Sequence, residues 1–416
     1  MMEAGTGAPA ARRRPAGRRT SLAGGQAHPR PFEEERPGIF ERSFFGLDFI
    51  VAVTAIVAVG FSAYTIAVTT KGDVPGEPYY FAIRQCIYAV VGIALMLGLA
   101  RIDYSRFREL RVGIYTAMIA SVVLVLALGE ATRGSRRWIE FPFFTFQPSE
   151  LGKLLLILAL AAFALERSRQ VGEWQRTARL LLLGVVPAGI VLLQPDLGTA
   201  LVYGAITLAV LFIAGVRWTH FAAIGAVAVA AVSAVLVIAP AIGHPILKDY
   251  QEERLTAFLN PSSDPRDSSY QINQSLIAIG SGGKTGRGDD STQTRQGFLP
   301  ERHTDFIFAV VGERFGFVGA AFLLSLYALL IWRALRILTL SKNLYGSMIA
   351  GGIAAMLMFQ VFVNVGMNIG IMPITGITLP LMSFGGSSIL VTFMALGILQ
   401  SIYVQARLTS KSRAPV

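Results

Sequence analysis

Ten long apolar stretches, separated by polar connections, dominate the pattern of the chain. Each stretch has about the 20 residues that a helix needs to cross roughly 30 Å of hydrocarbon. Their apolar positions are continuous rather than alternating, which favours helices over the strands of a barrel. The pattern therefore predicts an all-α polytopic membrane protein with ten transmembrane helices. The predicted helices cover residues 46–68, 80–100, 112–129, 149–165, 178–194, 197–215, 219–240, 306–332, 346–369 and 385–404.

Basic residues predict the orientation of these helices. The formal net charge is +11, and every second short connection carries Lys or Arg residues, at 101–111, 167–179, 217 and 333–342. Such clusters mark cytoplasmic loops, so we expect a multi-pass protein of the bacterial cell membrane with both termini cytoplasmic. The excess charge then reflects topology and predicts no nucleic-acid partner. Three segments fall on the extracytoplasmic side, namely residues 130–148, a long loop at about 241–305 between the seventh and eighth helices, and residues 370–384.

Composition supports this class of protein. The chain is 53% hydrophobic and only 15% charged, whereas soluble domains are about a quarter charged. Cys86 is the single cysteine, which excludes an internal disulfide and a Cys-rich metal site. Residues 1–44 are predicted to be a disordered basic cytoplasmic tail that either reinforces orientation or attracts anionic lipid. Residues 45–408 form the predicted transmembrane domain, and residues 409–416 form a second cytoplasmic tail.

A run of polar residues directly precedes the eighth predicted helix. It reads Glu301, Arg302, His303, Thr304 and Asp305. These groups are costly to desolvate at a membrane boundary, so a carboxylate placed there indicates a functional site.

The loop at 130–148 carries basic residues on the predicted outer side, against the usual charge asymmetry. Arg133, Arg136 and Arg137 precede Trp138. One interpretation is contact with lipid head groups beside an aromatic anchor. The other is a site for an anionic group such as a diphosphate, because Arg side chains match phosphate oxygens.

Three further polar residues occur near predicted helix starts. Glu150 and Lys153 are three residues apart and share one face of a helix. They form either a mutually neutralised structural pair or a polar face that points into a shared cavity. Asp196 lies in a tight turn between two helices and is expected to cap the second one.

Residues 364–388 are rich in Pro, Gly and small polar side chains, so a continuous helix cannot run through them. Broken backbone at membrane depth is tolerated where it is buried in protein or lines a cavity. This segment is expected to form a cavity wall that includes Ser387, or else a re-entrant structural plug. The glycine-rich run at 280–288 is not a nucleotide-binding loop, because Ala278 occupies a position where that motif needs Gly. We expect a flexible loop near the substrate instead.

Taken together, these motifs resemble the SEDS proteins (shape, elongation, division and sporulation), a family that includes RodA and FtsW. The resemblance spans residues from about 46 to 405, and the runs at 247–251 and 299–306 look closer to the RodA, elongation branch. The motifs that carry it are residues 136–139, 146–150, 194–199, 274–283, 298–308 and 364–388.

The resemblance implies a ten-helix SEDS fold and a peptidoglycan glycosyltransferase that acts on lipid II. It also implies a class B penicillin-binding protein as the transpeptidase partner. The family's catalytic aspartate corresponds to Asp305, and its cavity Glu and Lys correspond to Glu150 and Lys153. We therefore expect Asp305 to act as the general base during cell elongation. The alternatives are a lipid II flippase, a non-catalytic scaffold, and a division or sporulation polymerase.

The leaving diphosphate is expected to meet fixed cations or hydrogen-bond donors. His303 either orients the acceptor sugar or caps the helix. No cofactor is assigned, and no ligand cluster points to a metal, although the reaction leaves room for a divalent cation. The predicted substrate-binding residues are Glu150, Lys153, Arg133, Arg136, Arg137, Arg302, His303, Thr304 and Ser387.

Overall fold

The computed structural model describes most of the predicted transmembrane domain. It covers residues 46–128, 137–140, 144–166, 172–241, 268–295 and 297–411, together with positions 251, 254, 256 and 258. The predicted tail at residues 1–44 lies outside the described residues. Within the described part, a helix occupies each of the ten predicted apolar stretches.

Most of the described chain is helical. The principal helices are α1 (Phe49–Thr69), α2 (Tyr80–Arg101), α4 (Arg111–Leu128), α5 (Pro148–Ala164), α6 (Glu173–Leu193), α7 (Leu197–Ile213), α8 (Trp218–Ser233), α13 (Ile307–Leu340), α14 (Leu344–Asn368) and α15 (Gly386–Lys411). The smaller elements are α3 (Arg106–Glu109), β1 (Ile139–Glu140), β2 (Thr145–Phe146), the π-helical turn η2 (Ala234–Ile238), α9 (Ala239–Ala241), α11 (Ser268–Gly282), the 3₁₀ turn η3 (Gly288–Asp290) and α12 (Thr292–Arg295). The strands β1 and β2 pair antiparallel.

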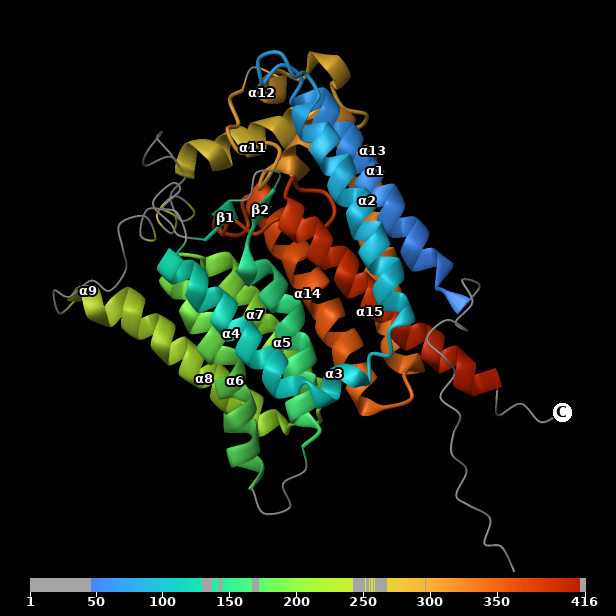
Figure 1. The fold of residues 1–416 in the computed structure, drawn as a ribbon. Helices are drawn as coiled ribbons and strands as arrows, with labels where there is room; N and C mark the ends of the chain where they lie inside the picture. The colour runs from blue at the N-terminus through green and yellow to red at the C-terminus, as the bar shows by residue number, and fades with distance from the viewer. Residues whose placement is uncertain are drawn as a thin grey trace, which may run out of the picture.

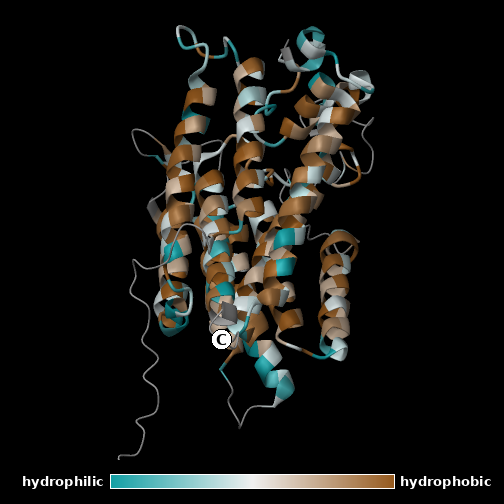
Figure 2. Cartoon of the chain, turned by 90° about the vertical axis from the view of Figure 1, so that its right-hand side faces the viewer, coloured by the Kyte–Doolittle hydropathy of each residue, from teal (hydrophilic) through white to brown (hydrophobic). Residues whose placement is uncertain are grey.

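Apolar helices of membrane-spanning length identify a membrane protein. Among the described residues, seven helices are long and apolar enough to cross a bilayer, and α4 and α7 are shorter apolar helices. Figure 2 shows hydrophobic residues along the helices and hydrophilic residues concentrated toward the ends of the bundle. In the most apolar 18-residue window of Trp218–Ala241 no residue is buried, and side chains such as Val227 and Val229 are largely exposed. A surface this apolar needs lipid or another apolar partner around it.

Several helix bounds differ from the predicted ones because polar side chains do not end a helix. α13 continues to Leu340 and α15 to Lys411, past the predicted ends at 332 and 404. Residues such as Arg336 can keep their charged heads in water while the backbone hydrogen bonds continue. The helix α11 was not predicted, since its polar and apolar residues do not form a membrane-length run.

The bundle has two groups of helices joined by α14. α4, α5, α6 and α7 pack together, α2 packs along α15, and α1 packs against α13 and α2. α14 contacts α7 on one side and α13 on the other. In Figure 1, α11, α12 and the β1–β2 hairpin lie at one end of the bundle. α1 begins and α15 ends at the opposite end.

A buried polar cluster joins three helices at that opposite end. The Asp48 carboxylate caps α1 by accepting from the main-chain N–H groups of Ile50 and Val51. It also pairs with the Arg333 guanidinium of α13, whose Nε lies 2.9 Å from Asp48 Oδ2. The Gln400 side chain of α15 exchanges two hydrogen bonds with the main chain of Asp48, at 2.7 and 2.8 Å. These bonds fix the register of α1, α13 and α15.

The glycine-rich run inserts its main chain into a kink of α13. Gly316 has a φ of +62°, which interrupts the helix and suits glycine. The N–H groups of Phe317 and Val318 then donate to the carbonyls of Gly283 and Lys284, at 2.9 and 3.1 Å. The loop therefore caps the second half of α13. This packing joins the loop after α11 to α13, so it links the segments before and after the polar run at 301–305.

Candidate functional site

Asp305 lies in a tight turn immediately before α13. The N–H groups of Thr304 and Phe306 both donate to the Glu301 carbonyl, at 3.3 and 3.1 Å. Phe306 is fully buried and packs with Leu299, while Asp305 itself is only partly buried. The turn therefore fixes its backbone in the core and leaves the Asp305 side chain at the edge of it.

The main chain of Asp305 is held by two amides of α14. Asn364 Nδ2 and Asn368 Nδ2 donate to the Asp305 carbonyl oxygen at 2.9 and 3.1 Å. Asn368 Oδ1 also accepts from the Ala309 N–H, in the first turn of α13. Both Asn side chains are completely buried, so an amide that lost its bond to the turn would have no water to replace it.

Gly376 lies directly opposite the Asp305 carboxylate. A Cβ added at Gly376 would lie 3.6 Å from Asp305 Oδ2, and the φ of +72° at this position also favours glycine. The broken segment after α14 therefore forms a close wall beside the carboxylate. That residues 364–388 line a cavity stays a prediction.

The environment of Asp305 favours its protonated form more than water does. Burial, followed by repulsion from the Glu301 carboxylate, raises the pKa of Asp305 to about 6. Arg254 and Arg137 oppose this rise, and Asp196 adds to it. A carboxylate with this pKa is mostly ionised at neutral pH and is a stronger base than an ordinary aspartate.

The neighbours of Asp305 have separate contacts. Arg302 forms an ion pair with Asp73 in the connection between α1 and α2, at 2.6 Å. The His303 ring packs against the rings of Phe81 and Phe384, with centroids 4.7 and 5.7 Å away. The Thr304 hydroxyl lies 2.8 Å from Glu301 Oε2 and donates to it. Arg302 and His303 therefore connect the turn to the α1–α2 side of the bundle.

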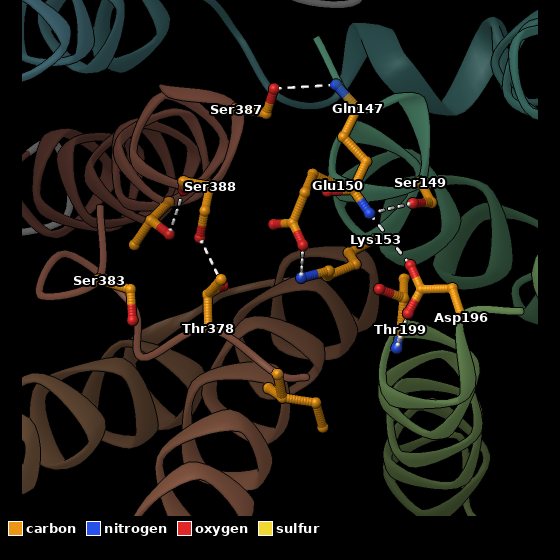
Figure 3. A network of polar contacts seen from close by, with 12 residues as sticks. Gln147, Ser149, Glu150, Lys153, Asp196, Thr199, Thr378, Ser383, Ser387 and Ser388 are labelled. Carbon is orange, nitrogen blue, oxygen red and sulfur yellow. Dashed lines mark hydrogen bonds and ion pairs between the residues drawn. The ribbon is translucent and has the colours of Figure 1, made fainter. Parts of the chain in front are cut away.

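Glu150 and Lys153 form a buried ion pair in the first turns of α5. Lys153 Nζ donates to Glu150 Oε1 at 2.6 Å, and the two side chains are 3% and 9% exposed respectively. Figure 3 shows this pair facing the segment that carries Thr378 and Ser388, whose hydroxyls lie 3.1 Å apart. The pair is therefore mutually neutralised and lies near the hydroxyl groups of Thr378 and Ser388, while its opening into a cavity stays a prediction.

Three helix N-termini meet beside this pair. Gln147, which precedes α5, donates from Nε2 to Asp196 Oδ2 at 3.0 Å, and its main-chain N–H donates to Ser387 Oγ at 2.9 Å (Figure 3). Asp196 caps α7 by accepting from the Thr199 N–H, as predicted. Ser387 lies in the first turn of α15 and donates to the Thr145 carbonyl. Helix N-termini carry partial positive charge, which favours anions.

Arg137 is directed at the turn before α7. Its Nε donates to the Gln194 carbonyl at 2.8 Å, and its NH2 group donates to the Pro195 carbonyl. Its charge also acts on Asp305. Arg133 and Arg136 lie outside the described residues, so their role in anion binding stays a prediction.

The two clusters share one connecting segment. A Cβ added at Gly198 in α7 would lie 2.7 Å from the Thr375 carbonyl, next to Gly376 and therefore next to Asp305. The structure thus brings Asp305, the Asp196 turn and the start of α5 to one end of the bundle. A base and several anion-favouring groups in one region suit transfer of a group from an anionic leaving group to a hydroxyl acceptor.

No metal site is evident in the described part of the chain. Among those residues, no group of three His, Cys, Asp or Glu side chains is placed to hold a metal ion.

Sequence reasoning missed the two asparagines that hold Asp305. Asn364 and Asn368 are four residues apart in an otherwise apolar helix, so they share a face. Buried amides in an apolar helix need hydrogen-bond partners, so the spacing of these asparagines could have marked them as residues that hold another segment. The closeness of Gly376 to Asp305 could not have been predicted from residue spacing, because Gly376 lies in the non-helical segment after α14.

Comparisons with known proteins agree on one family. The model of the cell cycle protein family of FtsW, RodA and SpoVE matches residues 46–408. Stage V sporulation protein E of Bacillus subtilis is 37% identical over 330 residues, which cover 78% of this chain and 87% of that protein. Peptidoglycan glycosyltransferase MrdB of Escherichia coli is 40% identical over 330 residues, which cover 79% of this chain and 87% of that protein.

A solved structure has the same fold. It is described as "Structural coordination of polymerization and crosslinking by a peptidoglycan synthase complex". The TM-score is 0.72 at 33% identity, over 86% of this chain and 98% of the other chain.

Proposed function

Because the chain belongs to the SEDS family of FtsW, RodA and SpoVE proteins and is a peptidoglycan glycosyltransferase, we propose that it polymerises lipid II. The substrate is a disaccharide-pentapeptide carried on undecaprenyl diphosphate, and the product is a glycan strand. The observation that carries this proposal is the Asp305 carboxylate, with its pKa raised to about 6. It lies close to the start of α7, because Gly376 faces it and the neighbouring Thr375 carbonyl packs against Gly198.

In this scheme, Asp305 removes the proton from the acceptor sugar hydroxyl. The hydroxyl oxygen then forms a bond to the anomeric carbon of the donor sugar, and the bond from that carbon to the diphosphate oxygen breaks. The electron pair leaves with undecaprenyl diphosphate, and the proton stays on Asp305 until it passes to solvent. The rest of the site has to stabilise the diphosphate and to exclude water from the anomeric carbon.

The anion-favouring groups suit the leaving diphosphate. Lys153 supplies a buried ammonium, and the N-termini of α5, α7 and α15 meet beside it. Arg137 adds a guanidinium at the same turn. Arg133, Arg136 and Arg302 remain proposed contacts to the substrate, as do His303, Thr304 and Ser387. No metal ligand is assigned, and the scheme is compatible with a divalent cation that arrives with the diphosphate.

We propose a topology of ten membrane-spanning helices with both termini in the cytoplasm. The long segment between α8 and α13, which contains α11 and α12, would then face outward with Asp305. Support comes from α1 beginning and α15 ending at the end of the bundle opposite α11 (Figure 1). The protein would reside in the bacterial cell membrane.

We further propose a role in cell elongation, as for RodA, with a class B penicillin-binding protein as partner. The runs at 247–251 and 299–306 support the elongation branch. A structural neighbour described as a complex for polymerization and crosslinking supports the partner. Rescue of rod shape in cells depleted of RodA would support the elongation role. Rescue of septation alone, in cells depleted of FtsW, would instead indicate a division role.

The function is tested with the purified full chain in liposomes that contain fluorescent lipid II, with and without a co-purified class B penicillin-binding protein. We expect a ladder of glycan polymer on a gel. Movement of lipid II between leaflets without any polymer would instead identify a flippase. Complex formation with neither activity would identify a scaffold.

A further inference from the structure

Hydrogen bonds to three consecutive main-chain carbonyls hold the turn that carries Asp305. The His303 carbonyl accepts from the Phe384 N–H at 2.8 Å, and the Thr304 carbonyl accepts from Ser383 Oγ at 2.6 Å. The Asp305 carbonyl accepts from the amides of Asn364 and Asn368. Each donor comes from residues 364–384, the end of α14 and the broken segment after it.

We propose that Asn364, Asn368 and Ser383 are positioning residues that set the direction of the Asp305 carboxylate through these carbonyls. This inference rests on the proposed function of Asp305 as the base. Asn364, Asn368 and Ser383 are each at most 1% exposed. Loss of Ser383 Oγ removes the donor to the Thr304 carbonyl, and loss of one Asn amide leaves the Asp305 carbonyl with the other alone. The turn is held less firmly in either case.

Ser383 has its hydroxyl proton directed by a second bond. Ser383 Oγ accepts from the Leu379 N–H at 2.8 Å, so its own proton is available to the Thr304 carbonyl. The chain next to Ser383 is also held in place. Ser62 Oγ donates to the Met382 carbonyl, and Gln85 Nε2 donates to Ser62 Oγ. The hydrogen bonds that hold the Asp305 turn therefore continue through Ser383 and Met382 to α1 and α2.

The amide group of Asn364 holds both the Asp305 turn and the segment opposite the Asp305 carboxylate. Its Nδ2 donates to the carbonyls of both Asp305 and Ile377, at 2.9 and 2.7 Å. Ile377 follows Gly376, the residue that faces Asp305 Oδ2. A change at Asn364 would therefore alter the space in which the acceptor hydroxyl has to fit, as well as the base.

A general base is sensitive to such movement, because a misplacement of about 1 Å can cost about a hundredfold in rate. A merely structural turn would instead affect stability and leave the chemistry of correctly folded molecules unchanged. The two explanations differ in how the effect depends on Asp305. A positioning residue loses its effect when the group it positions is absent.

The test is a double-mutant cycle on lipid II polymerisation by the full-length chain in liposomes. We expect Ser383→Ala to lower kcat about ten- to hundredfold with KM unchanged. The same change added to Asp305→Asn should lower the residual rate no further. Ser383→Thr, which keeps a hydroxyl, should recover most of the rate.

Tyr327→Phe is the matched control. Tyr327 is buried, and its hydroxyl donates to the Pro380 carbonyl at 2.6 Å. This variant also removes one buried hydrogen bond to the 364–388 segment, but it leaves the turn at 301–306 untouched. It should therefore keep the wild-type kcat. If Ser383→Ala does not fold, Ser383→Cys carries the same cycle, because the thiol fills nearly the same space and is only a weak donor.

Equal losses from Ser383→Ala in the presence and absence of Asp305 would overturn the positioning role, as would a change in KM alone. An unchanged kcat would overturn it too. Each of these results still requires the wild-type chain to polymerise lipid II, so none of them would mean that the proposed function has failed. In that second case the wild-type chain itself would make no polymer, and the positioning role would fall with it.

Discussion

Replacement of Asp305 by Asn is expected to lower the rate of glycan polymerisation by about a hundredfold to ten-thousandfold. The Asn side chain has nearly the same shape but cannot accept a proton at neutral pH. The main-chain bonds from Asn364 and Asn368 do not involve the replaced group, so the turn should keep its position. The variant should therefore insert into the membrane and unfold at the same temperature as the wild-type chain.

The measurement is polymer formation per unit time in liposomes, with lipid II in excess. Asp289→Asn is the matched control, because its carboxylate lies in the same segment between α8 and α13 and is 84% exposed. It should polymerise at the wild-type rate. An Asp305→Asn protein that polymerises lipid II as fast as the Asp289→Asn protein would refute the assignment of the base.

Breaking the Glu150–Lys153 pair is expected to cost both stability and activity. Lys153→Met leaves the Glu150 carboxylate buried without its counter-charge, which should destabilise the fold by about 3–5 kcal/mol. Glu150→Gln should do the same to the Lys153 ammonium. Thermal unfolding in detergent measures the stability, and polymer yield in liposomes measures the activity.

The double variant Glu150→Gln, Lys153→Met separates the two roles of the pair. Neutral side chains of similar size should restore stability close to the wild-type value. We expect polymerisation to stay low, because the ammonium proposed to stabilise the diphosphate is gone. A double variant that regains both stability and polymerisation would show that the pair is structural only.

The helices were predictable because a membrane imposes a simple pattern. An apolar run of about 20 residues has few folded states other than a helix, so α1 and α14 were found close to their observed bounds. The kink at Gly316 was not predictable. It depends on the carbonyls of Gly283 and Lys284, which are close to Phe317 and Val318 only in the folded chain.

The candidate site was only partly predictable, for a similar reason. Asp305, Glu150 and Lys153 stood out because charged groups at a membrane boundary are costly. Their partners did not, since Asn364 acts through an amide whose target is a main-chain carbonyl 59 residues away in sequence. Arg302 also illustrates the limit, because residue spacing gave no sign of its ion pair with Asp73, which lies in a distant connection.

The central claim is that an ionised Asp305 takes a proton from the acceptor hydroxyl. The most direct test is the dependence of the polymerisation rate on pH, with lipid II in excess and the same chain carrying Glu301→Gln as comparison. Because the pKa of Asp305 is raised to about 6, the rate should fall as the pH drops through about 6 and the base becomes protonated. Removing the Glu301 charge should lower that pKa and move the fall to lower pH. A rate that stays constant through this range, or a fall that Glu301→Gln leaves in place, would contradict the claim.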